Sequence, residues 1–169
     1  MLRIVLWVVA GLAGSVVFWL VQILTGGPTI TAFMGEQIVG TGGYPPGVMT
    51  LLGWAVHAGV SLAYAFLFGV LIFLLSSMSF PVRAAVSLVA ALGLGWVTAV
   101  IAPPAISVTV SLLGRQGWPG ELYPLNTEPG LPLWNHLLFF LLNWVIQSVG
   151  PHLLERITPG RGEIRLADV

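Results

Sequence analysis

Four long apolar stretches, none of which contains a charged residue, divide the chain. They cover residues 4–24, 48–75, 84–102 and 133–154. An α-helix rises about 1.5 Å per residue, so about 20 apolar residues cross a hydrocarbon layer about 30 Å thick. The second stretch is longer than one crossing needs, and we expect it to tilt or to project from the lipid. The pattern predicts an all-α, integral membrane four-helix bundle over residues 1–156, with two long external loops.

Composition agrees with a lipid environment. Hydrophobic residues make up 57% of the chain and charged residues only 7%, whereas soluble domains carry about 25% charged residues. The net charge is zero, which excludes the basic surface that nucleic-acid binding needs. The chain has no cysteine, so disulfides, thiolate metal sites and iron–sulfur clusters are excluded.

The arginines predict the orientation of the four helices. Five of the six lie at the N-terminus, in the turn between the second and third stretches, or in the tail: Arg3, Arg83, Arg156, Arg161 and Arg165. Positive residues in short flanks stay on the cytoplasmic side, so we expect both termini inside and residues 157–169 to form a cytoplasmic tail. Use of arginine without lysine hints at a GC-rich bacterial genome, and hence at the bacterial inner membrane. If the first stretch were instead a cleaved signal peptide, three spans would remain; its apolar run is long for that role.

The two external loops differ in pattern. Residues 30–39 are mildly apolar between glycine- and proline-rich turns, which predicts an interfacial helix. Pro103 and Pro104 are expected to end the third helix at residue 102. Residues 106–112 then alternate apolar and polar side chains, which is typical of a strand, although a continued, kinked helix is the alternative. Residues 114–132 are rich in glycine and proline and predict no regular structure.

Both halves of the chain also share one order of features: a helix with small residues, a double proline, and a helix that opens with Trp and His. The chain therefore resembles two tandem two-helix repeats, which would be related by an axis along the membrane normal. The double prolines fall at different offsets in the two halves, so chance similarity is the alternative.

Helical spacing places polar and small residues on faces that should point into the bundle, because a polar group in hydrocarbon needs a partner. One such face on the second helix carries His57, Ser61 and Tyr64. A second, on the fourth helix, carries His136, Asn143 and Gln147. Small residues that allow close helix packing are Gly11, Gly14, Gly93 and Gly95. The simplest interpretation of the polar faces is hydrogen bonding between helices.

Three function classes follow from these residues. The first is a non-catalytic accessory or structural subunit that packs against other membrane subunits or its own copies, since the polar faces contain no carboxylate pair and no hydrolase or nucleotide motif. The second is a haem, other tetrapyrrole or quinone site that uses His57 and His136. The third is a transporter or channel for a small neutral solute, because no charged residue lies within the helices to couple ions. We expect the first, and we expect no enzymatic activity.

Overall fold

The computed structural model describes residues 2–157 and, for side chains, residues 3–153. Within residues 2–157 every regular element is helical: α1 (Leu2–Leu24), α2 (Ile30–Gly42), a 3-10 turn η1 (Pro46–Val48), α3 (Met49–Leu74), α4 (Phe80–Leu113), α5 (Leu131–Trp144), a π-helical turn η2 (Val145–Val149) and α6 (Gly150–Ile157). The all-α class is thereby confirmed for this part of the chain. The predicted tail lies almost wholly outside the described residues.

Three helices of the described part of the chain are long and apolar enough to cross a membrane: Arg3–Leu24, Pro46–Leu74 and Phe80–Leu113. They correspond to the first three predicted spans. The fourth predicted span, residues 133–154, falls on α5, η2 and α6, which follow one another without a break. Here the helix contains a π-helical turn, so no single α-helix covers the whole stretch.

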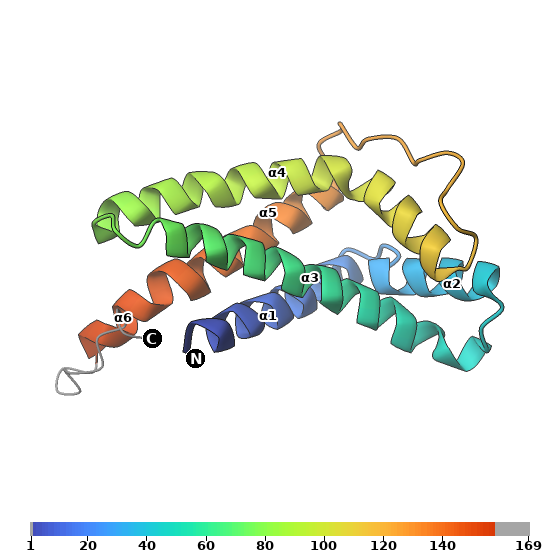
Figure 1. Ribbon diagram of the computed structural model, residues 1–169, viewed down its shortest axis with the longest axis horizontal. Coiled ribbons are helices and arrows are strands. Elements are labelled where there is room, and N and C mark those ends of the chain that lie inside the picture. Colours follow the sequence, from blue (N-terminus) through green and yellow to red (C-terminus); the bar gives the residue numbers. More distant parts are fainter. Residues whose placement is uncertain (1, 158–169) are drawn as a thin grey trace.

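The helices form an elongated bundle (Figure 1). Helix α1 packs against α3, and α4 packs against α5; the predicted tandem repeat of these two halves stays a prediction. The start of α1, the turn between α3 and α4, and α6 lie at one end, on the left of Figure 1, which we call the terminal end. Helix α2, η1 and the loop of residues 114–130 lie at the opposite end, which we call the loop end.

Three of the four predicted packing glycines lie where helices approach closely. A Cβ atom added at Gly11 would lie 3.1 Å from the Cβ of Ala65, and one at Gly95 would lie 3.0 Å from the Cα of Leu137. At Gly14 the added atom would lie 2.5 Å from the ring of Phe139. Gly93 differs from the expectation, since an added Cβ meets no atom there within 4 Å. Residues two apart on a helix face nearly opposite directions, so Gly93 faces outward because Gly95 faces α5.

A helix, α2, forms where the sequence predicted one in the first loop, while its place at the membrane interface stays a prediction. Its first turn is capped by Thr29, whose Oγ1 accepts a hydrogen bond of 3.2 Å from the amide of Ala32. Gly43, with a φ of 65°, ends the helix in the left-handed conformation that glycine adopts most easily. Met34 and Ile38 of α2 form a small core cluster with Val110 of α4. Helix α2 therefore packs against both the start of α3 and the end of α4 at the loop end.

Helix α4 continues through Pro103 and Pro104 to Leu113, so the expectations of a helix end at residue 102 and of a strand are wrong. A proline has a helical φ, but it lacks the N–H that would donate to the carbonyl four residues back, and its ring pushes against that carbonyl, so a helix that continues through proline bends. Figure 1 shows that α4 bends after these residues, towards α2. Beyond the bend Ser107 and Val110 are the buried residues, and their spacing of three is helical. The alternation of apolar and polar residues at 106–112 is therefore compatible with a helix, and the alternative of a continued helix is the one that the structure shows.

Candidate functional site

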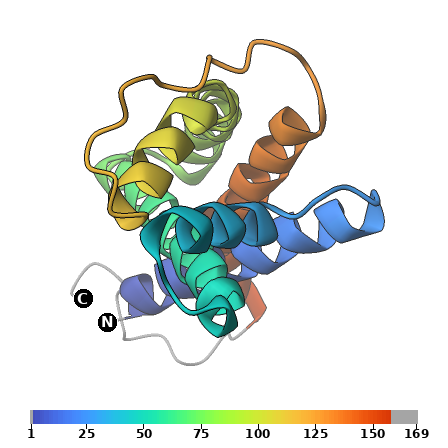
Figure 2. The ribbon, with the colours of Figure 1, turned by 90° about the vertical axis from the view of Figure 1, so that its right-hand side faces the viewer.

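A cavity of about 620 Å³ lies at the loop end, where α4 bends away from α5. Its walls come from α1, α2, α3, α4 and α5, and residues 124–126 of the loop contribute part of its cover. Figure 2 shows this loop arching from the end of α4 to the start of α5. Apolar side chains form much of the lining, among them Phe18, Met34, Val60, Ala102, Ile106 and Phe139.

The polar lining comes mainly from two helices. Helix α3 contributes His57, Ser61 and Tyr64, and α5 contributes Asn135 and His136. Further polar side chains are Gln22, Thr109 and Asn126. None of the described residues that line the cavity is an aspartate, glutamate, lysine or arginine. The cavity is therefore apolar with a neutral polar cluster on one side.

Backbone contacts determine the protonated nitrogen of both histidines. The Nε2 of His57 lies 3.1 Å from the carbonyl oxygen of Ser15, and the Nδ1 of His136 lies 2.8 Å from that of Pro132. A carbonyl oxygen only accepts, so each of these nitrogens carries the proton. His57 is left with Nδ1 as its acceptor and His136 with Nε2, the outer nitrogen of the ring. An Nδ1–H held by a backbone carbonyl, with Nε2 open, is the arrangement in which histidine binds ligands.

Phe18 of α1 contacts both histidine rings edge to face. The ring centroids lie 5.4 Å from His57 and 5.2 Å from His136. A haem held by Nε2 of both histidines does not suit this arrangement, because Nε2 of His57 already donates to Ser15. His136 has Nε2 as its acceptor nitrogen and His57 has Nδ1, so each histidine can accept one hydrogen bond from a donor in the cavity.

Asn135 is the residue that the sequence analysis missed. Its side chain is 1% exposed, and neither Oδ1 nor Nδ2 has a hydrogen-bond partner among the described residues. A buried polar group left without a partner costs about 1–3 kcal/mol. One signal was present, since Asn135, Phe139 and Asn143 follow at helical spacing on one face. Asn135 lines the loop-end cavity, so this unpartnered amide belongs to the candidate site.

Asn143 and Gln147 lie away from the cavity. Gln147 Nε2 donates to the Oδ1 of Asn143 at 2.9 Å and to the carbonyl oxygen of Ala65 at 3.2 Å. Asn143 Nδ2 in turn donates to the carbonyl oxygen of Phe139 at 2.9 Å. Gln147 belongs to the π-helical turn η2, a feature often found at functional sites. These two residues link α5 and η2 to α3, whereas the other four predicted polar residues, His57, Ser61, Tyr64 and His136, line the cavity.

Comparison with known proteins gives no further guide to the cavity's occupant. No protein-family model matches this chain, and no curated protein or solved structure is significantly similar to it. The chemistry of the site is therefore argued from its own residues. No group of three or more His, Asp or Glu side chains that could hold a metal ion lies together among the residues described.

Proposed function

We propose that this chain is a four-span integral membrane protein that binds a neutral amphiphile in its loop-end cavity. The molecule has an apolar body and a small head group that both donates and accepts hydrogen bonds, as a quinol–quinone pair does. The observation that carries the proposal is the buried, unpartnered amide of Asn135 in an apolar cavity, beside the open Nε2 of His136.

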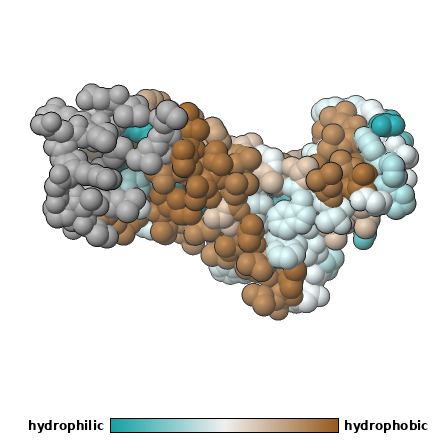
Figure 3. Space-filling view, turned by 90° about the horizontal axis from the view of Figure 1, so that it is seen from below, coloured by the Kyte–Doolittle hydropathy of each residue, from teal (hydrophilic) through white to brown (hydrophobic). Residues whose placement is uncertain are grey.

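The outer surface supports membrane insertion. Large apolar side chains point outward along the helices, including Val89 at 70%, Trp96 at 58% and Leu67 at 52% exposure. Figure 3 shows apolar residues gathered over the middle of one face, with paler, more polar ones among them and towards the loop end. Exposed apolar area on this scale would be unfavourable in water and suits a lipid environment.

Helical length supports the fourth span. Residues 131–157 continue as α5, η2 and α6, and at about 1.5 Å per residue they extend over about 40 Å, enough for a hydrocarbon layer. With four crossings the terminal end faces one side of the membrane. Arg3 and Arg83 lie at that end, which favours the cytoplasmic side for it. The loop-end cavity then opens in the outer half of the bilayer.

The polar cluster determines which head groups fit. The Nε2 of His136 accepts, so the ligand donates an O–H or N–H to it. The amide of Asn135 both donates and accepts, and the hydroxyl groups of Ser61 and Tyr64 can do either. Because no charged residue lines the cavity, a charged head group would lack a counter-ion in a medium of low dielectric. A quinol meets these conditions, because its hydroxyl groups can donate to Nε2 of His136 and can both donate to and accept from the amide of Asn135.

A decyl benzoquinol is the probe for this proposal. We expect saturable binding to the purified full-length chain in neutral detergent. Asn135→Leu and His136→Phe should each weaken binding about tenfold or more, the equivalent of about 1.4 kcal/mol. Ser61→Ala should weaken it, whereas Ser87→Ala should not, because Ser87 is an equally buried serine that bonds Ser148 outside the cavity.

Two results would contradict the quinol assignment. One is decyl benzoquinol binding that does not saturate, or that the three cavity variants Asn135→Leu, His136→Phe and Ser61→Ala leave unchanged. The other is a Soret absorption band in protein from native membranes that His136→Phe removes, which would assign a tetrapyrrole to the site.

An accessory subunit is the second candidate, and the outward-facing apolar side chains such as Val89 and Trp96 favour it, because a partner helix can pack on them. The native mass in mild detergent distinguishes the two. Stoichiometric foreign subunits would support the accessory role, and a single chain or homo-oligomer with bound amphiphile would support the first.

A further inference from the structure

Two hydrogen-bond acceptors without a partner lie on the wall of the loop-end cavity. His57 and His136 each donate their ring proton to a backbone carbonyl oxygen, that of Ser15 at 3.1 Å and that of Pro132 at 2.8 Å. In a neutral imidazole the second ring nitrogen only accepts, and this nitrogen is Nδ1 in His57 and Nε2 in His136. Neither of these two nitrogens has a hydrogen bond to the described part of the chain.

One aromatic ring brings the two histidines to the same part of the cavity. The ring of Phe18 contacts His57 at a centroid distance of 5.4 Å and His136 at 5.2 Å, edge to face in both cases. All three side chains line the cavity. A head group bound beside Phe18 therefore meets the acceptor sides of two imidazoles from different helices.

The other polar groups of the lining can serve a ligand that only accepts hydrogen bonds. The buried amide of Asn135 has no partner among the described residues and can donate as well as accept. Gln22 accepts from the backbone amide of Ile30 through Oε1 at 2.9 Å, which leaves its NH₂ group to donate. Thr109 donates to the carbonyl oxygen of Ala105 at 2.8 Å, so it can only accept from a ligand. A ligand carbonyl thus finds donors in the cavity, but the two imidazoles gain a partner only from a ligand that donates.

We infer that the cavity selects the reduced, hydroxyl-bearing form of its amphiphile, the quinol, over the oxidised quinone. A quinol has two O–H groups and can donate one to each histidine, whereas both oxygens of a quinone are carbonyls that only accept. A bound quinone would cover both imidazole nitrogens and leave them without a hydrogen bond, which is unfavourable. This selection rests on the proposed function, because it concerns which form of the couple the same cavity prefers.

Selection of the reduced form has a measurable redox consequence. Reduction of a quinone adds two electrons and two protons, and a protein that binds the quinol more tightly favours this direction. A tenfold preference for the quinol raises the midpoint potential of the bound couple above that of the free couple by about 30 mV, the two-electron value for a factor of ten.

The test compares the two forms of one probe on the full-length chain, in neutral detergent and without oxygen. Decyl benzoquinol and decyl benzoquinone carry the same tail and differ by two hydrogen atoms. We expect the quinol to bind about tenfold more tightly, the equivalent of about 1.4 kcal/mol. The dimethyl ether of decyl benzoquinol keeps the aromatic ring but cannot donate, and it should bind no more tightly than the quinone.

Two histidine variants separate hydrogen bonding from folding. His136→Gln places an amide near the position of Nε2, and His57→Asn places one near the position of Nδ1; an amide donates as well as accepts. Each variant should bind the quinone more tightly than the wild type does, so the two affinities should approach each other. A gain of quinone affinity is not a result that misfolding produces.

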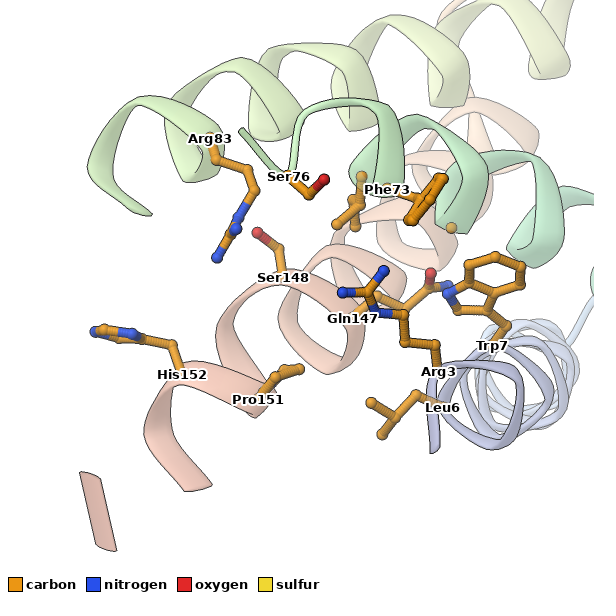
Figure 4. A pocket seen from close by; sticks show the side chains of 12 residues that line it. Arg3, Leu6, Trp7, Phe73, Ser76, Arg83, Gln147, Ser148, Pro151 and His152 are labelled. Carbon is orange, nitrogen blue, oxygen red and sulfur yellow. The ribbon is translucent and has the colours of Figure 1, made fainter. Parts of the chain in front are cut away.

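His152→Gln is the matched control. His152 lines a smaller pocket of about 160 Å³ at the terminal end (Figure 4), where its ring stacks on Phe80 with a centroid distance of 3.7 Å. Because this histidine lies at the opposite end of the bundle from the cavity, its replacement should leave the preference for the quinol unchanged.

Three outcomes would overturn the inference. Equal affinities of the wild type for the two forms, or tighter quinone binding, would exclude selection of the quinol and leave the proposed amphiphile site in place. A preference for the quinol that His57→Asn and His136→Gln both leave unchanged would assign it to groups other than the histidines. Saturable binding of neither form would exclude the proposed function, and the selection with it.

Discussion

The backbone amide of Asn126 donates a hydrogen bond of 3.0 Å to the carbonyl oxygen of Val100. In a regular helix the residue four positions on would donate to that oxygen, but here that residue is Pro104, which has no N–H. The loop of residues 114–130 therefore supplies the donor that the proline removes. Since residues 124–126 also cover the cavity, this bond joins the bend of α4 to the cover of the candidate site.

Replacing Pro104 with alanine should loosen the loop. The new N–H competes with Asn126 for the oxygen of Val100, and α4 can straighten towards a regular helix. We expect faster amide hydrogen exchange at residues 120–128, measured by mass spectrometry. Pro81→Ala is the control, because a proline in the first turn of α4 removes no helical hydrogen bond. Unchanged exchange in Pro104→Ala would mean that the loop is held by other contacts.

Gly14→Ala should destabilise the bundle, whereas Gly93→Ala should not. The Cβ at residue 14 would lie 2.5 Å from the Phe139 ring, while at residue 93 it meets nothing within 4 Å. Overpacking of this kind costs about 1–3 kcal/mol. Unfolding by sodium dodecyl sulfate in mixed micelles measures both free energies. Similar destabilisation by both alanines would show that helix flexibility, rather than contact, sets the requirement for glycine.

Asn135 and Asn143 are equally buried asparagines, at 1% and 0% exposure. Replacement by leucine should nevertheless change the free energy of unfolding differently at the two positions. Asn143→Leu removes the acceptor of Gln147 Nε2 and should lower the free energy of unfolding by about 1–3 kcal/mol. Asn135→Leu removes no bond within the described chain, so the ligand-free protein should keep or gain stability. Unfolding of delipidated protein tests this, and a large loss from Asn135→Leu would contradict the assignment of a ligand-facing amide.

Trp144 links the end of α5 to the start of α4 by a hydrogen bond, since its Nε1 donates to the carbonyl oxygen of Ala84 at 3.0 Å. Trp144→Phe keeps an aromatic ring but loses this bond, and should cost about 1 kcal/mol of unfolding free energy. Trp96→Phe is the matched control, because Trp96 is largely exposed. Equal unfolding free energies for the two variants would argue that the indole contact contributes nothing.

The sequence by itself determined where the helices lie. The apolar stretches 4–24 and 48–75 agree with α1 and α3 to within a few residues, because helix formation depends on side chains close together in the chain. It also placed His57, Ser61 and Tyr64 on one face of one helix, since helical spacing alone decides that.

Only the tertiary structure decided how these pieces meet. Pro104 removes a helical donor, and Asn126, a loop residue far along the chain, donates to the carbonyl oxygen of Val100 in its place. Asn143 and Asn135 look alike in sequence, but the approach of α3 and η2 gives one its partners and leaves the other facing a cavity. The smaller pocket at the terminal end likewise lies between residues of α1 and α4. Contacts between distant segments depend on how the helices cross, which no local spacing encodes.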